Sequence, residues 1–178
     1  MQCAEQVPST PVEFERGLSL EAAANSAFFV YGTLKQGQIR GGVWPFPPSQ
    51  IVPAVIQADL YDLGPYPAAA HGSGWILGEL WFFEPFQVAT TIQVLDAIEG
   101  FEENGTNNEY DREIVNVFAS GLDSESEVKA HAYFAARTDQ LARFRRIPPF
   151  LQFLGRNVAV WPDTMTRVPK SPERQSKT

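Results

Sequence analysis

The chain has 178 residues, of which 44% are hydrophobic and 12% aromatic, so it is long enough to bury one hydrophobic core and is predicted to form a single domain. Its formal net charge of −7 disfavours nucleic acid and anionic membranes as partners, and no segment approaches the roughly 20 apolar residues of a membrane-spanning helix. The lone Cys3 excludes an intrachain disulfide and a cysteine-based metal site, so we expect a cytoplasmic protein.

The two ends differ in composition from the middle of the chain. Residues 1–26 mix prolines, glutamates and alanines without strand alternation and without the basic and apolar pattern of a signal peptide, which predicts a flexible extension. Residues 163–178 carry basic residues, prolines and almost no large apolar side chains, which predicts a flexible basic tail. The folded domain is therefore placed at residues 27–162.

Short apolar runs bounded by turn residues predict strands along most of this domain. The first runs from Phe28 to Tyr31 and stops at Gly32, where a loop follows to Gly37. The segment 44–48 (WPFPP) is predicted to be a loop with exposed or lid-like aromatic side chains, because its prolines remove backbone donors.

Four further strands are predicted at residues 55–63, 75–83, 112–118 and 128–135. Turns are assigned to Gly64-Pro65, to residues 72–74 and to Gly121. A helix is predicted from Gln87 to Glu99, closed by Gly100. Residues 139–146 and 150–154 are predicted to be short helices, so the expected fold class is α+β.

The position of Glu99 on the predicted helix indicates chemistry. At about 100° per residue, Glu99 lies about 40° from Leu95 and about 20° from Ile92, within the apolar stripe. Burial and the negative end of the helix dipole both favour the protonated carboxyl, and a raised pKa suits a general base. The periodicity taken alone favours a frayed helix end with Glu99 in water, or a structural ion pair between Glu99 and Arg112.

Two further segments carry candidate binding groups. The loop of Tyr31, Gly32, Thr33 and Leu34 follows a strand directly, and its glycine lets backbone N–H groups face a ligand, although an ordinary turn has the same pattern. Tyr110 and Arg112 alternate at the start of a predicted strand, so both side chains fall on one face, where Arg112 pairs with Glu99 or with a substrate. The two histidines lack the clustered partners of a metal site.

Several short motifs, taken in order, resemble one family. They are residues 30–37 (VYGTLKQG), 60–64 (LYDLG), 66–67 (YP), 78–80 (GEL), 95–100 (LDAIEG) and 110–112 (YDR). Over residues 28–136 the chain resembles the gamma-glutamylcyclotransferase-like family. The Lys35-Gln36-Gly37 continuation is more similar to the gamma-glutamylamine cyclotransferase-like branch.

The resemblance implies a small mixed β-barrel flanked by helices, acting on a small-molecule gamma-glutamyl substrate without a metal or organic cofactor. It implies that Glu99 matches the family's catalytic glutamate. The enzyme would then be a lyase or acyltransferase that releases 5-oxoproline and an amine or amino acid. Residues 31–34 would hold the glutamyl end, with Tyr110 and Arg112 as further binding residues. The alternative is a non-catalytic small-molecule-binding or protein-interaction module on the same fold. A third reading assigns the same ring closure to a biosynthetic pathway that removes a glutamyl protecting group.

Overall fold

The structure is a computed structural model that describes residues 26–120 and 126–162. Three predictions concern residues outside these ranges: the extension at residues 1–26, of which only Ser26 is described, the tail at residues 163–178, and the turn at Gly121. Five strands close into a mixed barrel: β1 (Ala27–Val30), β2 (Gln50–Asp62), β3 (Pro67–Phe82), β4 (Tyr110–Ala119) and β5 (Ser126–Ala135). The predicted α+β barrel is confirmed.

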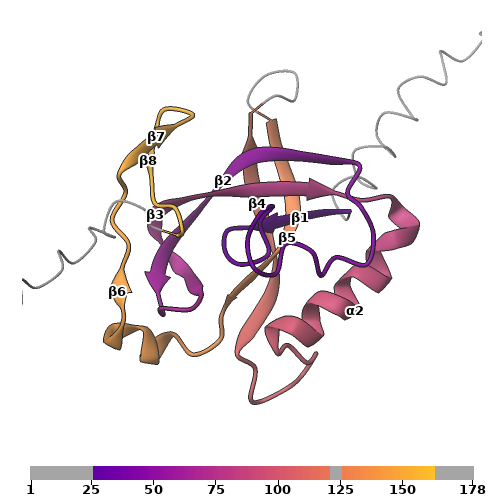
Figure 1. Cartoon of the computed structure of the whole chain (residues 1–178). Coiled ribbons are helices and arrows are strands. Elements are labelled where there is room, and N and C mark those ends of the chain that lie inside the picture. Colours follow the sequence, from indigo (N-terminus) through magenta and orange to yellow (C-terminus); the bar gives the residue numbers. More distant parts are fainter. Residues whose placement is uncertain (1–25, 121–125, 163–178) are drawn as a thin grey trace, which may run out of the picture.

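The strands join in the order β3, β1, β5, β4 and β2, and β2 closes the ring by pairing with β3. β1 runs parallel to β5, and the other barrel pairings are antiparallel. The helix α2 (Val88–Glu99) follows the short 3₁₀ helix η1 (Pro85–Gln87) and lies along one side of the barrel (Figure 1). The later elements run along the opposite side.

β1 separates two apolar clusters because its side chains alternate between the faces of the barrel wall. Phe29 belongs to the cluster inside the barrel, whereas Phe28 and Val30 belong to the cluster that also contains Leu95 of α2. The predicted helix is confirmed from Val88 to Glu99, and Gly100 ends it in the left-handed conformation with a φ of 66°. The apolar stripe of α2 therefore faces the barrel as its spacing predicted.

Two predictions about local structure are wrong. Residues 72–74 do not form a turn but lie within β3. Their glycines are needed for a close approach of Asp59: a Cβ at Gly72 would lie 2.4 Å from Cγ of Asp59, and a Cβ at Gly74 would lie 2.6 Å from its Oδ1. The glycines allow the Asp59 carboxylate to pack against β3 beside a register shift in β2, where the Gly74 N–H donates to it at 3.0 Å.

The second wrong prediction concerns residues 150–154, which do not form a helix. They contain β7 (Leu151–Phe153), which pairs with β8 (Arg156–Val158) as a hairpin. Leu154 and Gly155 both have positive φ, 48° and 68°, as a two-residue hairpin turn requires.

The predicted helix at residues 139–146 is partly right. The chain forms the 3₁₀ helix η2 (Thr138–Arg143) and then β6 (Arg145–Arg146), which pairs with β2.

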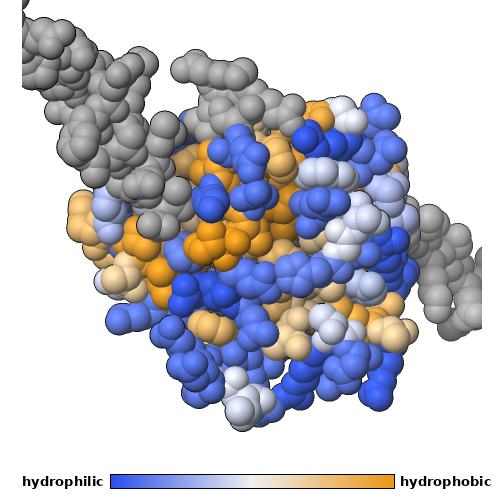
Figure 2. All heavy atoms as spheres, turned by 180° about the vertical axis from the view of Figure 1, so that it is seen from behind, coloured by the Kyte–Doolittle hydropathy of each residue, from blue (hydrophilic) through white to orange (hydrophobic). Residues whose placement is uncertain are grey.

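Seen from behind, hydrophobic side chains on the surface of the molecule gather in a patch bordered by hydrophilic ones (Figure 2). Within the described residues, no helix has the length and apolar character needed to cross a membrane.

Candidate active site

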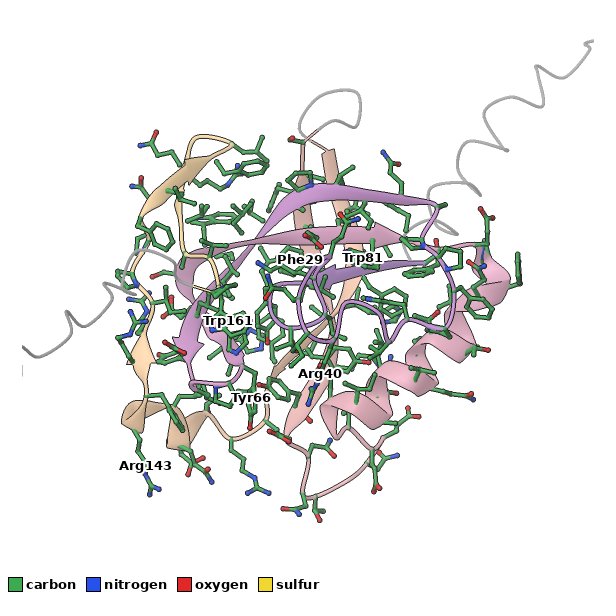
Figure 3. The ribbon with its side chains drawn as sticks, in the orientation of Figure 1. Phe29, Arg40, Tyr66, Trp81, Arg143 and Trp161 are labelled. Atoms are coloured by element: carbon green, nitrogen blue, oxygen red, sulfur yellow. The ribbon has the colours of Figure 1, made fainter. Side chains whose placement is uncertain are left out.

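A cavity of about 300 Å³ lies where the end of α2 meets the loop that follows β1. Glu99 and Ile98 line it from α2, and residues 31–34 line it from the loop. The other lining residues are Phe29, Val30, Arg40, Tyr66, Pro67, Glu109, Tyr110 and Tyr133. In Figure 3, Arg40 and Tyr66 lie at the same end of the barrel, near the end of α2. The tertiary structure thus brings together the predicted glutamate and the predicted loop.

The loop that follows β1 is held by hydrogen bonds to its carbonyl groups. Thr33 O accepts from Arg40 N at 2.9 Å, and Leu34 O accepts from Trp44 Nε1 at 3.2 Å. Gly32 packs so closely on Pro67 that a Cβ would lie 2.8 Å from its Cγ. Within the described part of the chain, none of the hydrogen bonds uses the backbone N–H groups of residues 32–34 as donors. These donors therefore have capacity for a ligand.

Glu99 combines partial burial with a position in the cavity wall. Burial raises the pKa of its carboxyl to about 7; nearby Arg40 opposes this shift, and the negative charge of Glu109 adds to it. Glu99 is thus partly protonated near neutral pH, which suits a group that both accepts and donates a proton.

Four tyrosines line the cavity, and each donates its hydroxyl hydrogen to a group of the protein. Tyr31 donates to the backbone oxygen of Tyr133 at 2.7 Å, and Tyr110 donates to that of Pro67 at 2.9 Å. Tyr133 donates to Asp96 at 2.7 Å, and Tyr66 donates to Glu109 at 2.9 Å. Burial is the main cause that raises the pKa of Tyr31, Tyr110 and Tyr133, so these hydroxyls stay neutral. The tyrosines thus provide ring surface and shape to the cavity.

Arg112 is not brought to the cavity. Its Nε donates to Asp96 Oδ1 at 2.9 Å, and its guanidinium lies 5.3 Å from the ring centre of Phe101. The pairing with Glu99 that the sequence allowed is replaced by this ion pair with Asp96, three residues earlier on α2. Arg112 therefore anchors the last turn of α2, which ends at Glu99.

Four lining residues with charged or hydroxyl-bearing side chains were not predicted from the sequence: Arg40, Tyr66, Glu109 and Tyr133. Tyr66 lies in a motif that carried the family resemblance, so this motif could have identified it. Arg40 and Glu109 gave no signal, because they reach the cavity from irregular segments whose course depends on the tertiary fold.

The residues that indicated a particular branch of the family contact other parts of the protein. Lys35 Nζ donates to the backbone oxygen of Trp161, and the backbone N–H of Gln36 donates to Glu79 Oε2 at 2.9 Å. Neither residue lines the cavity. The assignment to the gamma-glutamylamine branch therefore stays a prediction.

The predicted exposure of the aromatic residues at 44–48 is wrong. Trp44 stacks on Trp81 with ring centres 4.5 Å apart, and both Trp44 and Phe46 pack against the cluster that contains Leu95. No residue of this segment lines the cavity, so the segment does not form its lid.

Within the described ranges, no group of three or more His, Cys, Asp or Glu side chains is arranged to hold a metal ion.

Comparison with known proteins agrees with the class that the fold and site define, a small mixed barrel with an acidic cavity. The family described as "Gamma-glutamyl cyclotransferase, AIG2-like" matches residues 28–149. The chain belongs to this family. No curated protein matches the chain at a significant level.

Two solved structures with TM-scores above 0.5 support the fold. An AIG2-like protein from Mus musculus is 18% identical with a TM-score of 0.51, over 68% of this chain and 84% of that one. A protein from Arabidopsis thaliana is 19% identical with a TM-score of 0.51, over 72% and 76% of the two chains. YkqA from Bacillus subtilis is 22% identical with a TM-score of 0.45, over 62% of this chain; the match spans 36% of YkqA's length.

Proposed function

We propose that the chain is a gamma-glutamylcyclotransferase-type enzyme that releases 5-oxoproline and a free amine or amino acid from a gamma-glutamyl compound. The observation that carries this proposal is a carboxyl group, Glu99, with a pKa of about 7 in the wall of a cavity that also presents backbone donors. Membership of the family supports the reaction class.

In the proposed reaction, ionised Glu99 takes a proton from the α-amino group of the bound glutamyl compound. The nitrogen then attacks the γ-carbonyl carbon and closes a five-membered ring. Protonated Glu99 returns the proton to the leaving nitrogen as the old carbon–nitrogen bond breaks. The cavity contributes by holding the substrate folded, so that the reacting atoms lie at roughly 3 Å.

The donors for the glutamyl end follow from the hydrogen bonds of the site. Because the four lining tyrosines donate their hydroxyl hydrogens to protein groups, we assign substrate binding to the N–H groups of residues 32–34 and to the Thr33 hydroxyl. Arg40 adds a positive charge to a wall that also carries Glu99 and Glu109. Among the described residues it forms no ion pair. A substrate carboxylate would satisfy this cation.

A panel of gamma-glutamyl amines, amino acids and peptides, assayed for 5-oxoproline, tests the proposal. Release of 5-oxoproline with a stoichiometric amount of free amine is expected from at least one of them. Binding without turnover across the panel would instead support the non-catalytic module. The aromatic residues Trp44 and Phe46, predicted to be exposed, are the docking surface on which the protein-interaction form of that alternative would rely, and the packing of Trp44 against Trp81 removes much of it.

The pH dependence of kcat/KM gives a second prediction. Because Glu99 must be ionised to accept a proton, kcat/KM should rise with pH across about 7. The positive charge of Arg40 lowers the pKa of Glu99, so Arg40→Met should move this acid limb to higher pH, whereas Arg40→Lys should leave it nearer the wild-type position. An acid limb at the same pH in Arg40→Met would contradict the assignment of Glu99 as the base.

A further inference from the structure

A second hollow, of about 430 Å³, adjoins the candidate active site. The two share Tyr66, Glu109 and Tyr110 as lining residues, so these three side chains form the wall between them. The rest of the second hollow is lined by Leu63, Ala68, Asn107, Ala135, Arg137, Gln140, Leu141 and Phe144. We call this hollow the outer groove. Resting on the proposed function, we infer that it binds the leaving group of the substrate, and that this leaving group has an apolar side chain and a free carboxylate.

The backbone places the outer groove on the leaving-group side of Glu99. Glu109 N donates to Gly100 O at 3.2 Å, so the shared wall lies beside the residue that follows Glu99. Ala136 N donates to Glu109 O at 3.2 Å, which sets Arg137 just beyond this wall. The outer groove thus begins at Glu109 and extends toward Arg137, whereas residues 31–34 line the first cavity and not the groove.

The wall combines one fixed residue with a hydrogen-bonded pair near the surface. Tyr110 is buried and donates to Pro67 O at 2.9 Å. Tyr66 and Glu109 are joined by a hydrogen bond of 2.9 Å between more exposed side chains. A substrate held by the loop at residues 31–34 therefore reaches the groove across the Tyr66–Glu109 pair.

The lining of the groove defines the chemistry of its occupant. Five of its lining residues are apolar, and one of these, Phe144, remains 40% exposed, which leaves hydrophobic surface for an aliphatic or aromatic side chain. Arg137 lies at the rim and donates to the neutral amide oxygen of Asn107. Glu109 repels a carboxylate at the near end, so the carboxylate of the leaving group is drawn to Arg137 at the far end. An apolar amino acid or a short apolar peptide fits both features.

Three substrates test this inference: gamma-glutamyl-leucine, gamma-glutamyl-leucine amide and gamma-glutamyl-methylamine. All are assayed for 5-oxoproline with wild-type protein, Arg137→Gln, Phe144→Ala and Arg143→Gln. Arg143 is the matched control, because it is an exposed arginine on η2 that lines neither hollow and points away from the barrel in Figure 3.

Wild-type protein should prefer gamma-glutamyl-leucine to the methylamine by about tenfold or more in kcat/KM, through a lower KM. In Arg137→Gln the ratio of kcat/KM for the leucine compound to that for its amide should fall about fivefold, as loss of an exposed ion pair would give. Phe144→Ala should lower the preference for leucine over methylamine. Arg143→Gln should behave as wild type.

The outcomes separate the two proposals. If all three substrates release 5-oxoproline with similar kcat/KM, or if Arg137→Gln and Arg143→Gln give the same ratios, the inference about the groove is overturned while the proposed function stands. If none of the three releases 5-oxoproline and a wider panel also fails, the proposed function falls, and the groove assignment falls with it.

Discussion

Substitution Glu99→Gln is expected to lower the rate of 5-oxoproline release by about 10²-fold to 10⁴-fold, the contribution typical of a positioned general acid or base. Glutamine keeps the size of the side chain but cannot accept and return a proton. The loss should appear in kcat, with a smaller change in KM, because residues 31–34 still hold the glutamyl end. The measurement is steady-state kinetics on whichever gamma-glutamyl compound the wild-type protein turns over.

A control variant accompanies this substitution. Glu103→Gln removes a carboxylate from an exposed position outside the cavity and should retain wild-type activity. A Glu99→Gln variant that keeps more than a tenth of wild-type kcat would contradict the assignment of Glu99 as the proton shuttle.

The stability of Glu99→Gln shows whether the variant has lost its fold. Burial raises the pKa of Glu99 from 4.5 to about 7, so between these values the folded protein binds more protons than the unfolded chain. The wild-type protein therefore loses stability as pH rises through this window, and the glutamine variant lacks this loss. At pH 8 the variant should consequently melt at a temperature equal to or above that of the wild type.

Substitution Gly78→Ala is expected to destabilise the fold by about 2 kcal/mol or more, because overpacking a close contact typically costs about 1 to 3 kcal/mol. A Cβ at residue 78 would lie 2.4 Å from the backbone oxygen of Val30 and 2.6 Å from Cζ of Phe29. The oxygen belongs to β1, which is held between β3 and β5, so it cannot move aside cheaply. The midpoint of urea denaturation measures the effect.

Gly42→Ala is the matched control, since a Cβ at Gly42 would meet no described atom within 4 Å. Its denaturation midpoint should stay at the wild-type value. Equal midpoints for the two alanine variants would show that the contact between β3 and β1 accommodates a methyl group. The added methyl group should displace β1 in Gly78→Ala. Because β1 leads directly into residues 31–34, this displacement should also weaken substrate binding.

Much of the fold followed from local patterns in the sequence. The spacing of Val88, Ile92, Leu95 and Ile98 predicted α2, and Gly100 predicted its end, because helix periodicity and a left-handed terminus are properties of neighbouring residues. The pairing of strands that are separated along the chain was harder to predict from the sequence. The glycines at 72 and 74 have the composition of a turn, and their role against Asp59 depends on a strand that is distant along the chain.

The candidate site divides in the same way. The sequence by itself determined that Glu99 continues an apolar stripe at the end of a helix and that a glycine-containing loop follows a strand. The tertiary structure alone decided that these two segments share a cavity, that Arg40 and Glu109 set the pKa of Glu99 in opposite directions, and that Arg112 pairs with Asp96. The physical reason is that periodicity acts between neighbours in the chain, whereas burial and charge act through distances in space, which barrel closure fixes.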